Sequence, residues 1–128
     1  MALSKTARTL VAAATSNTVG STTRGTIDIE AVYGGVLTLK MTNGATGPTV
    51  QCTANVLIAH NATLPTAASA GADWKTMYTV GGGTTNNAVT EIAIPIDPSI
   101  MALEVEFTGN TGQTVTVEAF LSELTSPV

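Results

Sequence analysis

Alternation of apolar and polar residues with a period of two runs through most of this chain, and it is the feature that most constrains the fold. The stretch TIDIEAVY places one apolar set, Ile27, Ile29, Ala31 and Tyr33, opposite Asp28 and Glu30. The stretch VLTLKMT does the same with Leu37, Leu39 and Met41. A period of two puts alternate side chains on opposite faces of a strand, so both stretches are predicted to be half-buried β-strands.

Further strands follow the same pattern. Gly34-Gly35 between the first two stretches predicts a β-hairpin, because a two-residue turn there tolerates positive φ. A long strand is expected to place Val50, Cys52, Ala54, Val56 and Ile58 on one face. The remaining strands are predicted at residues 74–80, 89–96, 100–108 and 114–124. In the last two, the inward sets are Leu103, Val105 and Phe107, then Val115, Val117, Ala119 and Leu121.

These strands indicate an all-β chain of one domain. Residues 61–73 are small and polar and are read as an exposed loop or crossover. Thr makes up roughly a fifth of the sequence, and its stiff β-branched side chain favours a pleated sheet. We expect a jelly-roll-like β-sandwich of seven to eight antiparallel strands at residues 22–128. Residues 1–21 are expected to form an extended N-terminal arm or an edge strand.

The composition favours assembly with other chains. Charged residues are only 11% of the 128 residues, against roughly 25% in an ordinary soluble domain. A surface with so little charge is expected to be buried partly against partners. The net charge is −4 and the basic residues are scattered, which argues against nucleic acid and anionic membranes as partners. No stretch approaches membrane-spanning length, and LVAAA is too short for a signal-peptide core.

One phrase occurs twice, as GATGPTV at residues 44–50 and as GNTGQTV at residues 109–115. Glycine-rich loops can cradle phosphates, but a phosphate loop needs a following helix and a Lys-Ser or Lys-Thr ending, which both copies lack. We interpret the phrase as a reused turn in which a strand ends, the chain reverses and Thr-Val begins the next strand.

The reactive residue types do not form a catalytic pattern. Cys52 lies on an apolar face and is read as a buried small hydrophobe rather than a nucleophile. His60 stands alone, which excludes a two-His metal site within one chain, and the chain has no G-x-S-x-G elbow. The pairs Asp28 with Glu30 and Glu104 with Glu106 lie opposite the apolar faces. They are expected to be solvated or to contact a subunit, the alternative being a carboxylate or Ca²⁺ site.

Two further segments carry an alternative reading. The loop VGGGTTNNAV at residues 80–89 is interpreted as a flexible hairpin loop rather than an anion site, since it lacks a basic residue. Trp74 and Tyr78 would share one strand face. They are expected to be a core or intersubunit anchor, the alternative being a platform on which a sugar stacks.

Three long phrases together resemble the small decoration or cement proteins of tailed bacteriophages: TTRGTIDIEAVYGGVLTLKMTNGATGPTVQC, AGADWKTMYTVGGGTTNNAVTE and the segment from residue 104 to 123. The resemblance covers residues 22–123 and rests on phrasing and size, not on a catalytic motif. It implies a β-rich protein that adds to the outside of an icosahedral capsid as a dimer or trimer and stiffens it without catalysis.

The resemblance also implies partners and a location. The expected partners are the major capsid protein and further copies of the chain, on the capsid exterior of a virion made in the bacterial cytoplasm, with no cofactor or metal. The candidate interface residues are Leu3, Arg8, Leu10, Val11, Pro48, Trp74, Tyr78, Gly109 and Gly112. The alternatives are a carbohydrate-binding or adhesive module that uses Trp74 and Tyr78, and a tail or connector component.

Overall fold

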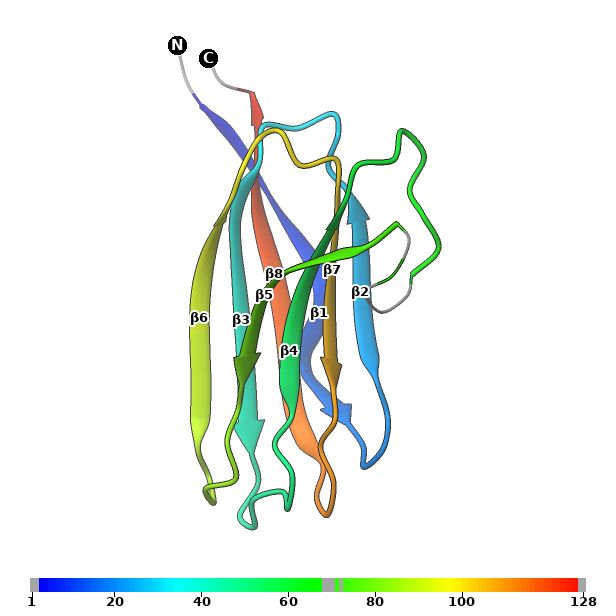
Figure 1. Ribbon diagram of the computed structural model, residues 1–128. Helices are drawn as coiled ribbons and strands as arrows, with labels where there is room; N and C mark the ends of the chain where they lie inside the picture. Colours follow the sequence, from blue (N-terminus) through cyan, green and yellow to red (C-terminus); the bar gives the residue numbers. More distant parts are fainter. Residues whose placement is uncertain (1–2, 68–70, 72, 127–128) are drawn as a thin grey trace.

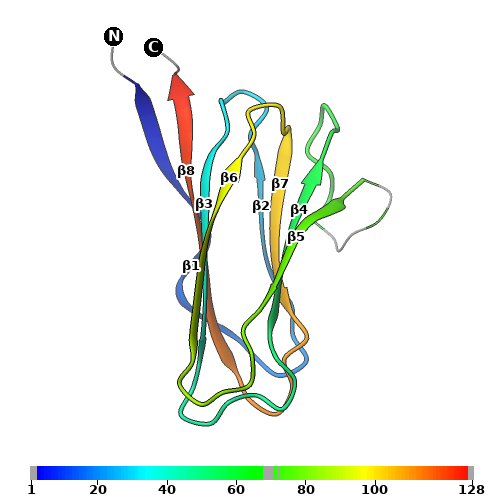
Figure 2. The same cartoon turned by 60° about the vertical axis from the view of Figure 1, so that its left-hand side comes forward.

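The chain folds into two packed antiparallel sheets, seen as two layers in the computed structural model (Figures 1 and 2). The structure describes residues 3–67, 71 and 73–126. The strands are β1 (Ser4–Asn17), β2 (Thr23–Asp28), β3 (Gly35–Asn43), β4 (Thr53–Ala59), β5 (Lys75–Gly81), β6 (Val89–Ile96), β7 (Ala102–Thr108) and β8 (Val115–Ser126). Sheet A has the order β1-β8-β3-β6 and sheet B the order β2-β7-β4-β5.

The strand order is that of a jelly roll, so the predicted fold class is confirmed. The first strand pairs with the last, the second with the seventh, the third with the sixth and the fourth with the fifth. A chain with these pairs is one long hairpin rolled up into two sheets. As a consequence, the connections β1–β2, β3–β4, β5–β6 and β7–β8 all lie at one end of the sandwich (Figure 1).

The core between the sheets is built from the alternating residues that the sequence pattern identified. Leu37, Leu39 and Met41 of β3 are buried, as are the predicted inward sets of β7 and β8. The sheets approach each other most closely where β2 meets β1. A Cβ added at Gly25 would lie 2.3 Å from the carbonyl oxygen of Leu10, so only glycine fits there.

The predicted hairpin at Gly34-Gly35 is wrong. β2 ends at Asp28 and belongs to sheet B, while β3 begins at Gly35 and belongs to sheet A. Residues 29–34 therefore cross between the sheets, and Ala31 and Tyr33 are exposed rather than inward. The loop at residues 80–89 is not a hairpin loop either, since β5 and β6 lie in different sheets. Local pattern specified the strands, but the choice of sheet depends on long-range pairing.

The long strand predicted from Val50 begins later, at Thr53 in β4. Val50 forms only an isolated bridge with Thr111, and half of its surface is exposed. Ile58 keeps the predicted inward face, opposite Leu103, and packs partly buried against the core. Leu57 on the other face is also buried, in a cluster with Trp74. The starts of β5, β7 and β8 also shift, to Lys75, Ala102 and Val115.

Most of the expected N-terminal segment forms β1, the edge strand of sheet A. Ser4–Asn17 pairs with β8, and the register shifts twice between Thr9 and Thr15, where Ala14 has a φ of 62°. Such irregularities on an edge strand hinder unwanted pairing with other chains. Of the two forms that the sequence left open, an arm or an edge strand, the structure has the edge strand.

Candidate functional site

Four loops at one end of the sandwich form a surface without a single charged residue, which we call the uncharged end. It consists of residues 18–22, 44–52, 82–88 and 109–114. Thr, Ser, Gly, Asn, Gln and small apolar residues supply its whole surface. Val19 and Val50 project from it with about half of their area exposed, 51% and 50%, and Val89 stands at its border.

Both copies of the repeated phrase lie at this end, and they pair with each other. The amide of Thr49 donates to the carbonyl of Thr111 at 2.8 Å, and the amide of Thr111 donates to that of Val50 at 3.2 Å. Gly112 has a φ of +82°, and a Cβ there would lie 2.4 Å from Oγ1 of Thr49. The phrase is therefore architectural, as predicted, although each copy carries the chain between the sheets rather than reversing it within one.

Buried asparagines tie the first and fourth loops together. The side chain of Asn17 donates to Oδ1 of Asn110 at 2.5 Å, and that of Asn110 donates back to the carbonyl of Asn17 at 2.9 Å. The hydroxyl of Thr23 donates to Asn17 at 2.7 Å. Because both amides are buried, each bond substitutes for water that the site excludes. The sequence pattern did not single out these asparagines.

The second and third loops are joined by comparable bonds. Asn43 donates through its side chain to the carbonyls of Gly83 and Thr85, at 3.2 and 2.9 Å. The amide of Gly47 donates to Oδ1 of Asn86 at 2.7 Å. With the bonds between Thr49, Val50 and Thr111, the four loops form one connected and preorganised surface.

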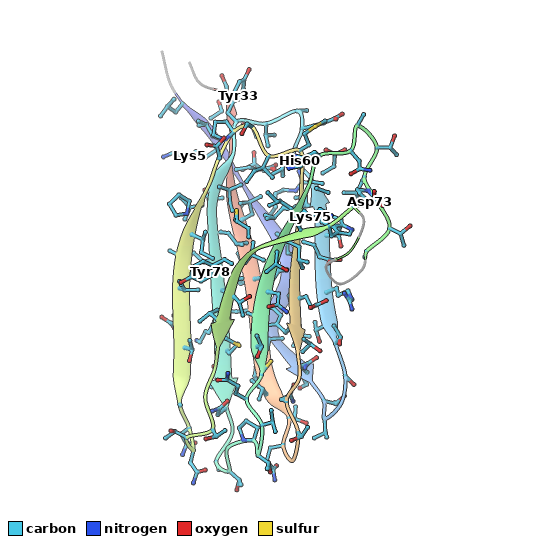
Figure 3. All side chains as sticks on the ribbon, in the orientation of Figure 1. Lys5, Tyr33, His60, Asp73, Lys75 and Tyr78 are labelled. Atoms are coloured by element: carbon cyan, nitrogen blue, oxygen red, sulfur yellow. The ribbon has the colours of Figure 1, made fainter. Side chains whose placement is uncertain are left out.

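The opposite end carries the charges, and we call it the charged end. It consists of residues 29–34, 60–74 and 97–101, as far as they are described, with Glu30, His60, Asp73 and Asp97 in its loops. Figure 3 shows His60, Asp73 and Lys75 near this end, with Lys5 and Tyr33 close to the chain termini. The hydroxyl of Ser99 and its backbone amide both donate to Asp97 and hold the pKa of that exposed carboxyl below its usual value.

Trp74 is a core anchor and cannot act as an open sugar platform. It is 2% exposed, it packs with Leu57, Ala59 and Ala102 on the outer side of sheet B, and its indole donates to the carbonyl of Thr66 at 2.8 Å. Tyr78 is 41% exposed on β5, so the two aromatic residues do not share an accessible face.

The prediction that Glu104 and Glu106 are solvated or contact a subunit is wrong, since within the single chain they are already only 0% and 4% exposed. Nη1 of Arg24 lies 2.5 Å from Glu106 and 3.9 Å from Glu104. Asn55 donates to Glu106 at 2.9 Å, and Thr26 donates to Glu104 at 3.2 Å. Residues from β2 and β4 flank the carboxylates on both sides. The carboxylates therefore belong to a structural network, while the other pair, Asp28 and Glu30, is exposed.

Several expected interface residues are not accessible. Val11 and Pro48 are buried, and Leu10 packs against the core. The accessible members are Leu3, Arg8, Tyr78, Gly109 and Gly112. Arg8 is exposed while its guanidinium pairs with Glu123 at 3.0 Å, and the two glycines lie at the uncharged end.

No catalytic or metal-binding arrangement emerges from the described part of the chain. Among those residues, no group of three or more His, Cys, Asp or Glu could hold a metal ion, and no helix is long and apolar enough to cross a membrane. Cys52 is fully buried, and burial raises the pKa of its thiol to about 11, opposed by a hydrogen bond with the backbone of Thr108. A thiol that holds its proton so strongly is a poor nucleophile, in agreement with the sequence prediction.

Comparisons with known proteins identify the fold and not a family. No protein-family model and no curated protein matches this sequence. The K3 adhesin domain of Lys-gingipain from Porphyromonas gingivalis has a similar structure, with a TM-score of 0.52, 7% identity, and coverage of 84% of this chain and 71% of the domain. PorU from the same organism matches with a TM-score of 0.52 and 8% identity over 97% of this chain and 13% of PorU.

A family 16 carbohydrate-binding module is also similar, with a TM-score of 0.46 and 8% identity. It covers 81% of this chain and 70% of the module. At such identities, the likeness extends to the β-sandwich fold alone.

Proposed function

We propose that this protein is a non-catalytic binding module that attaches to a larger assembly through its uncharged end. The observation that carries the proposal is the absence of charge from all four loops of that end, in a protein whose other end is charged. Removing a charged group from water costs more than removing an uncharged one. A surface with exposed valines and no charges therefore suits a contact that excludes water.

The hydrogen bonds within the uncharged end support the same proposal. The buried pair of Asn17 and Asn110, and the bonds between the copies of the repeated phrase, hold the loops in one arrangement. A preorganised surface loses less conformational entropy on binding than a mobile one. Its exposed hydroxyl and amide groups can form hydrogen bonds with a partner, and the exposed Val19 and Val50 add apolar contact area.

The partner that we propose first is the major capsid protein of a tailed bacteriophage, on the capsid exterior. Support comes from the resemblance of residues 22–123 to decoration proteins and from the low charge of the chain. Contacts of several copies with a repeating shell would raise the overall affinity without a large interface for each copy.

A neutral glycan is the second candidate partner. Uncharged Thr, Asn and Gln side chains are suitable hydrogen-bonding groups for sugars, and one protein that shares the fold is described as an adhesin domain. The burial of Trp74 counts against the stacking platform first considered, which leaves Tyr78 as the exposed aromatic residue on β5.

The test is co-sedimentation with decoration-free shells assembled from the major capsid protein of the same phage. We expect saturable binding with a stoichiometry that fits icosahedral symmetry. Val50→Glu should abolish this binding, because it introduces a charge into the uncharged surface that makes the contact. The matched control is Tyr33→Glu, which adds the same charge at a similarly exposed residue of the charged end, where 48% of Tyr33 is exposed.

Two outcomes would contradict the capsid proposal. One is no binding at micromolar concentration, and the other is equal loss of binding in both variants. Binding to a neutral glycan on an array, weakened by Val50→Glu or by Tyr78→Ala, would favour the second candidate. Deletion of residues 1–21 is unsuitable as a test, because it would remove β1 from sheet A.

A further inference from the structure

The outer side of sheet A is open along β8, β3 and β6, whereas the outer side of sheet B is covered along β7. On sheet B, Trp74, Glu104 and Glu106 are all buried. On sheet A, the outward residues of the three strands β8, β3 and β6 are exposed or half-buried. These are Thr116, Glu118, Phe120 and Ser122, then Val36, Thr38, Lys40 and Thr42, then Val89, Glu91, Ala93 and Pro95. We call this set the open face.

Charge on the open face is confined to one row across the sheet. The strand register places Lys40 opposite Glu118 on one side and opposite Glu91 on the other. Nζ of Lys40 lies 3.7 Å from Glu91. These three residues, with Thr38 and Ala93, line a shallow hollow of about 340 Å³. The rows above and below contain only uncharged side chains. The open face therefore carries one row of alternating charges, Glu91, Lys40 and Glu118, between uncharged rows.

We propose that a second copy of this chain packs on the open face, about a two-fold axis parallel to the strands and midway between β3 and β8. That axis passes through the middle of sheet A, whose order is β1-β8-β3-β6. This axis places Lys40 of each copy opposite Glu118 of the other copy, so the contact contains two symmetric Lys40–Glu118 pairs. A two-fold contact of this kind uses the same surface on both copies.

The charge pattern selects this axis over the other simple choice. A two-fold axis perpendicular to the strands and crossing them at Lys40 would place Lys40 against its own copy, which is repulsive. With the parallel axis, Thr38 meets Phe120 of the second copy, and Val36 meets Ser122. Two sheets that stack with nearly parallel strands follow the usual aligned packing of β-sandwiches.

The size of the face fits a weak to moderate dimer. The proposed axis lays β6 of one copy over β1 of the other, so the contact takes in all four strands of sheet A. Four strands are about 19 Å wide, and seven residues of strand are about 24 Å long, which gives roughly 450 Å² in projection. Standard interfaces bury about 800 Å² of accessible surface on each partner, and accessible area exceeds the projected area. The contact therefore lies at the lower end of stable interfaces.

The direction of the proposed axis determines where the two uncharged ends lie in the dimer. Rotation about an axis parallel to the strands leaves their direction unchanged, so the two uncharged ends would lie side by side at the same end of the dimer. The dimer would then bind a repeating surface through two sites at once. The dimer itself does not rest on the proposed function, because its contact uses other residues.

The experiment is sedimentation equilibrium of the full chain, from about 1 µM to roughly 100 µM. We expect the wild-type chain to dimerise in this range. Glu118→Lys should weaken the dimer by roughly tenfold or more, because it sets like charges against each other at two symmetric positions. The double exchange of Lys40→Glu with Glu118→Lys should restore association, since it recreates the opposite pairs.

The matched control is Glu91→Lys. Glu91 is also a neighbour of Lys40 in the same sheet, but the proposed axis places it over Ala12–Ala14 of the second copy rather than over Lys40. Association should therefore change by less than about threefold. Circular dichroism of each variant checks folding. A wild-type monomer at all concentrations would overturn the proposal, and so would equal effects of Glu118→Lys and Glu91→Lys.

Discussion

The two ends of the sandwich differ in charge and in how their loops are held. At the uncharged end, four loops are joined by backbone bonds and by the buried side chains of Asn17, Asn43 and Asn110. At the charged end, residues 60–74 connect β4 to β5, and in their described part bonds such as Asn61 to Asp73 and Trp74 to Thr66 run within the loop.

The difference separates two ways of stabilising loops. Uncharged loops can be packed together through neutral amides, because neutral amides are cheaper to bury than charges. The charged end keeps its carboxylates in water and anchors its long loop with one large apolar side chain, Trp74. We infer that the first kind of end suits attachment and the second suits exposure to solvent.

The largest effect is expected from the anchor of the charged end. Trp74→Ala should lower the free energy of unfolding by about 3–5 kcal/mol, because it removes a fully buried aromatic side chain. It should also expose residues 60–67 to proteases. Urea denaturation measures the first effect, with Tyr78→Ala as the exposed aromatic control. A loss below about 1 kcal/mol would show that the loop does not depend on Trp74.

The next effect concerns the buried amides of the uncharged end. Asn110→Ala should cost about 2–3 kcal/mol, since it leaves the buried side chain of Asn17 without its main partner. Asn61→Ala removes an exposed amide bond at the charged end and should cost at most about 0.5 kcal/mol. Equal losses in the two variants, measured by urea denaturation, would remove the distinction between the ends.

Two glycines of the uncharged end, Gly112 and Gly20, allow the cost of backbone strain to be compared with the cost of close packing. Gly112→Ala should cost about 2 kcal/mol, because its backbone is left-handed and its Cβ would meet Thr49. Gly20→Ala has a similar φ of +75° with open space around it, and should cost only about 1 kcal/mol. Thermal unfolding of both variants gives the comparison, and the packing argument fails if Gly20→Ala is the more costly.

The smallest effect tests the one ionisable side chain within the uncharged end, the thiol of Cys52. Its pKa is about 11 in the folded chain, against 9.0 as the ordinary value. The thiol therefore favours folding below pH 9, and this contribution is lost as the pH rises from 9 to 11. At pH 10 the loss is on the order of 1 kcal/mol. Cys52→Ala should be less sensitive to pH over this range, and an unchanged slope would contradict burial of the thiol.

The sequence predicted the fold through its alternation and failed where pairing over long distances decides the outcome. The inward sets of β3, β7 and β8 were correct residue by residue, because burial on one face is a local pattern. The Gly34-Gly35 hairpin was wrong, because nothing local indicates that β2 and β3 belong to different sheets.

The uncharged end was only partly predictable. The repeated phrase was recognised as a turn, but its two copies are 65 residues apart, from Gly44 to Gly109, and their pairing follows from the jelly-roll topology. Glu104 and Glu106 were predicted to be solvated, because the sequence does not show that Arg24 and Asn55 flank them. The alternation within a strand predicts on which side of the sheet a residue lies. It does not predict which residues of other strands cover that side.

Hydrogen–deuterium exchange of the protein, free and bound to decoration-free shells, tests the role of the uncharged end most directly. We expect binding to slow exchange in residues 18–22, 44–52, 82–88 and 109–114, and to leave residues 29–34, 60–67 and 97–101 unchanged. Protection of the charged end, with unchanged exchange in the four uncharged loops, would contradict the account.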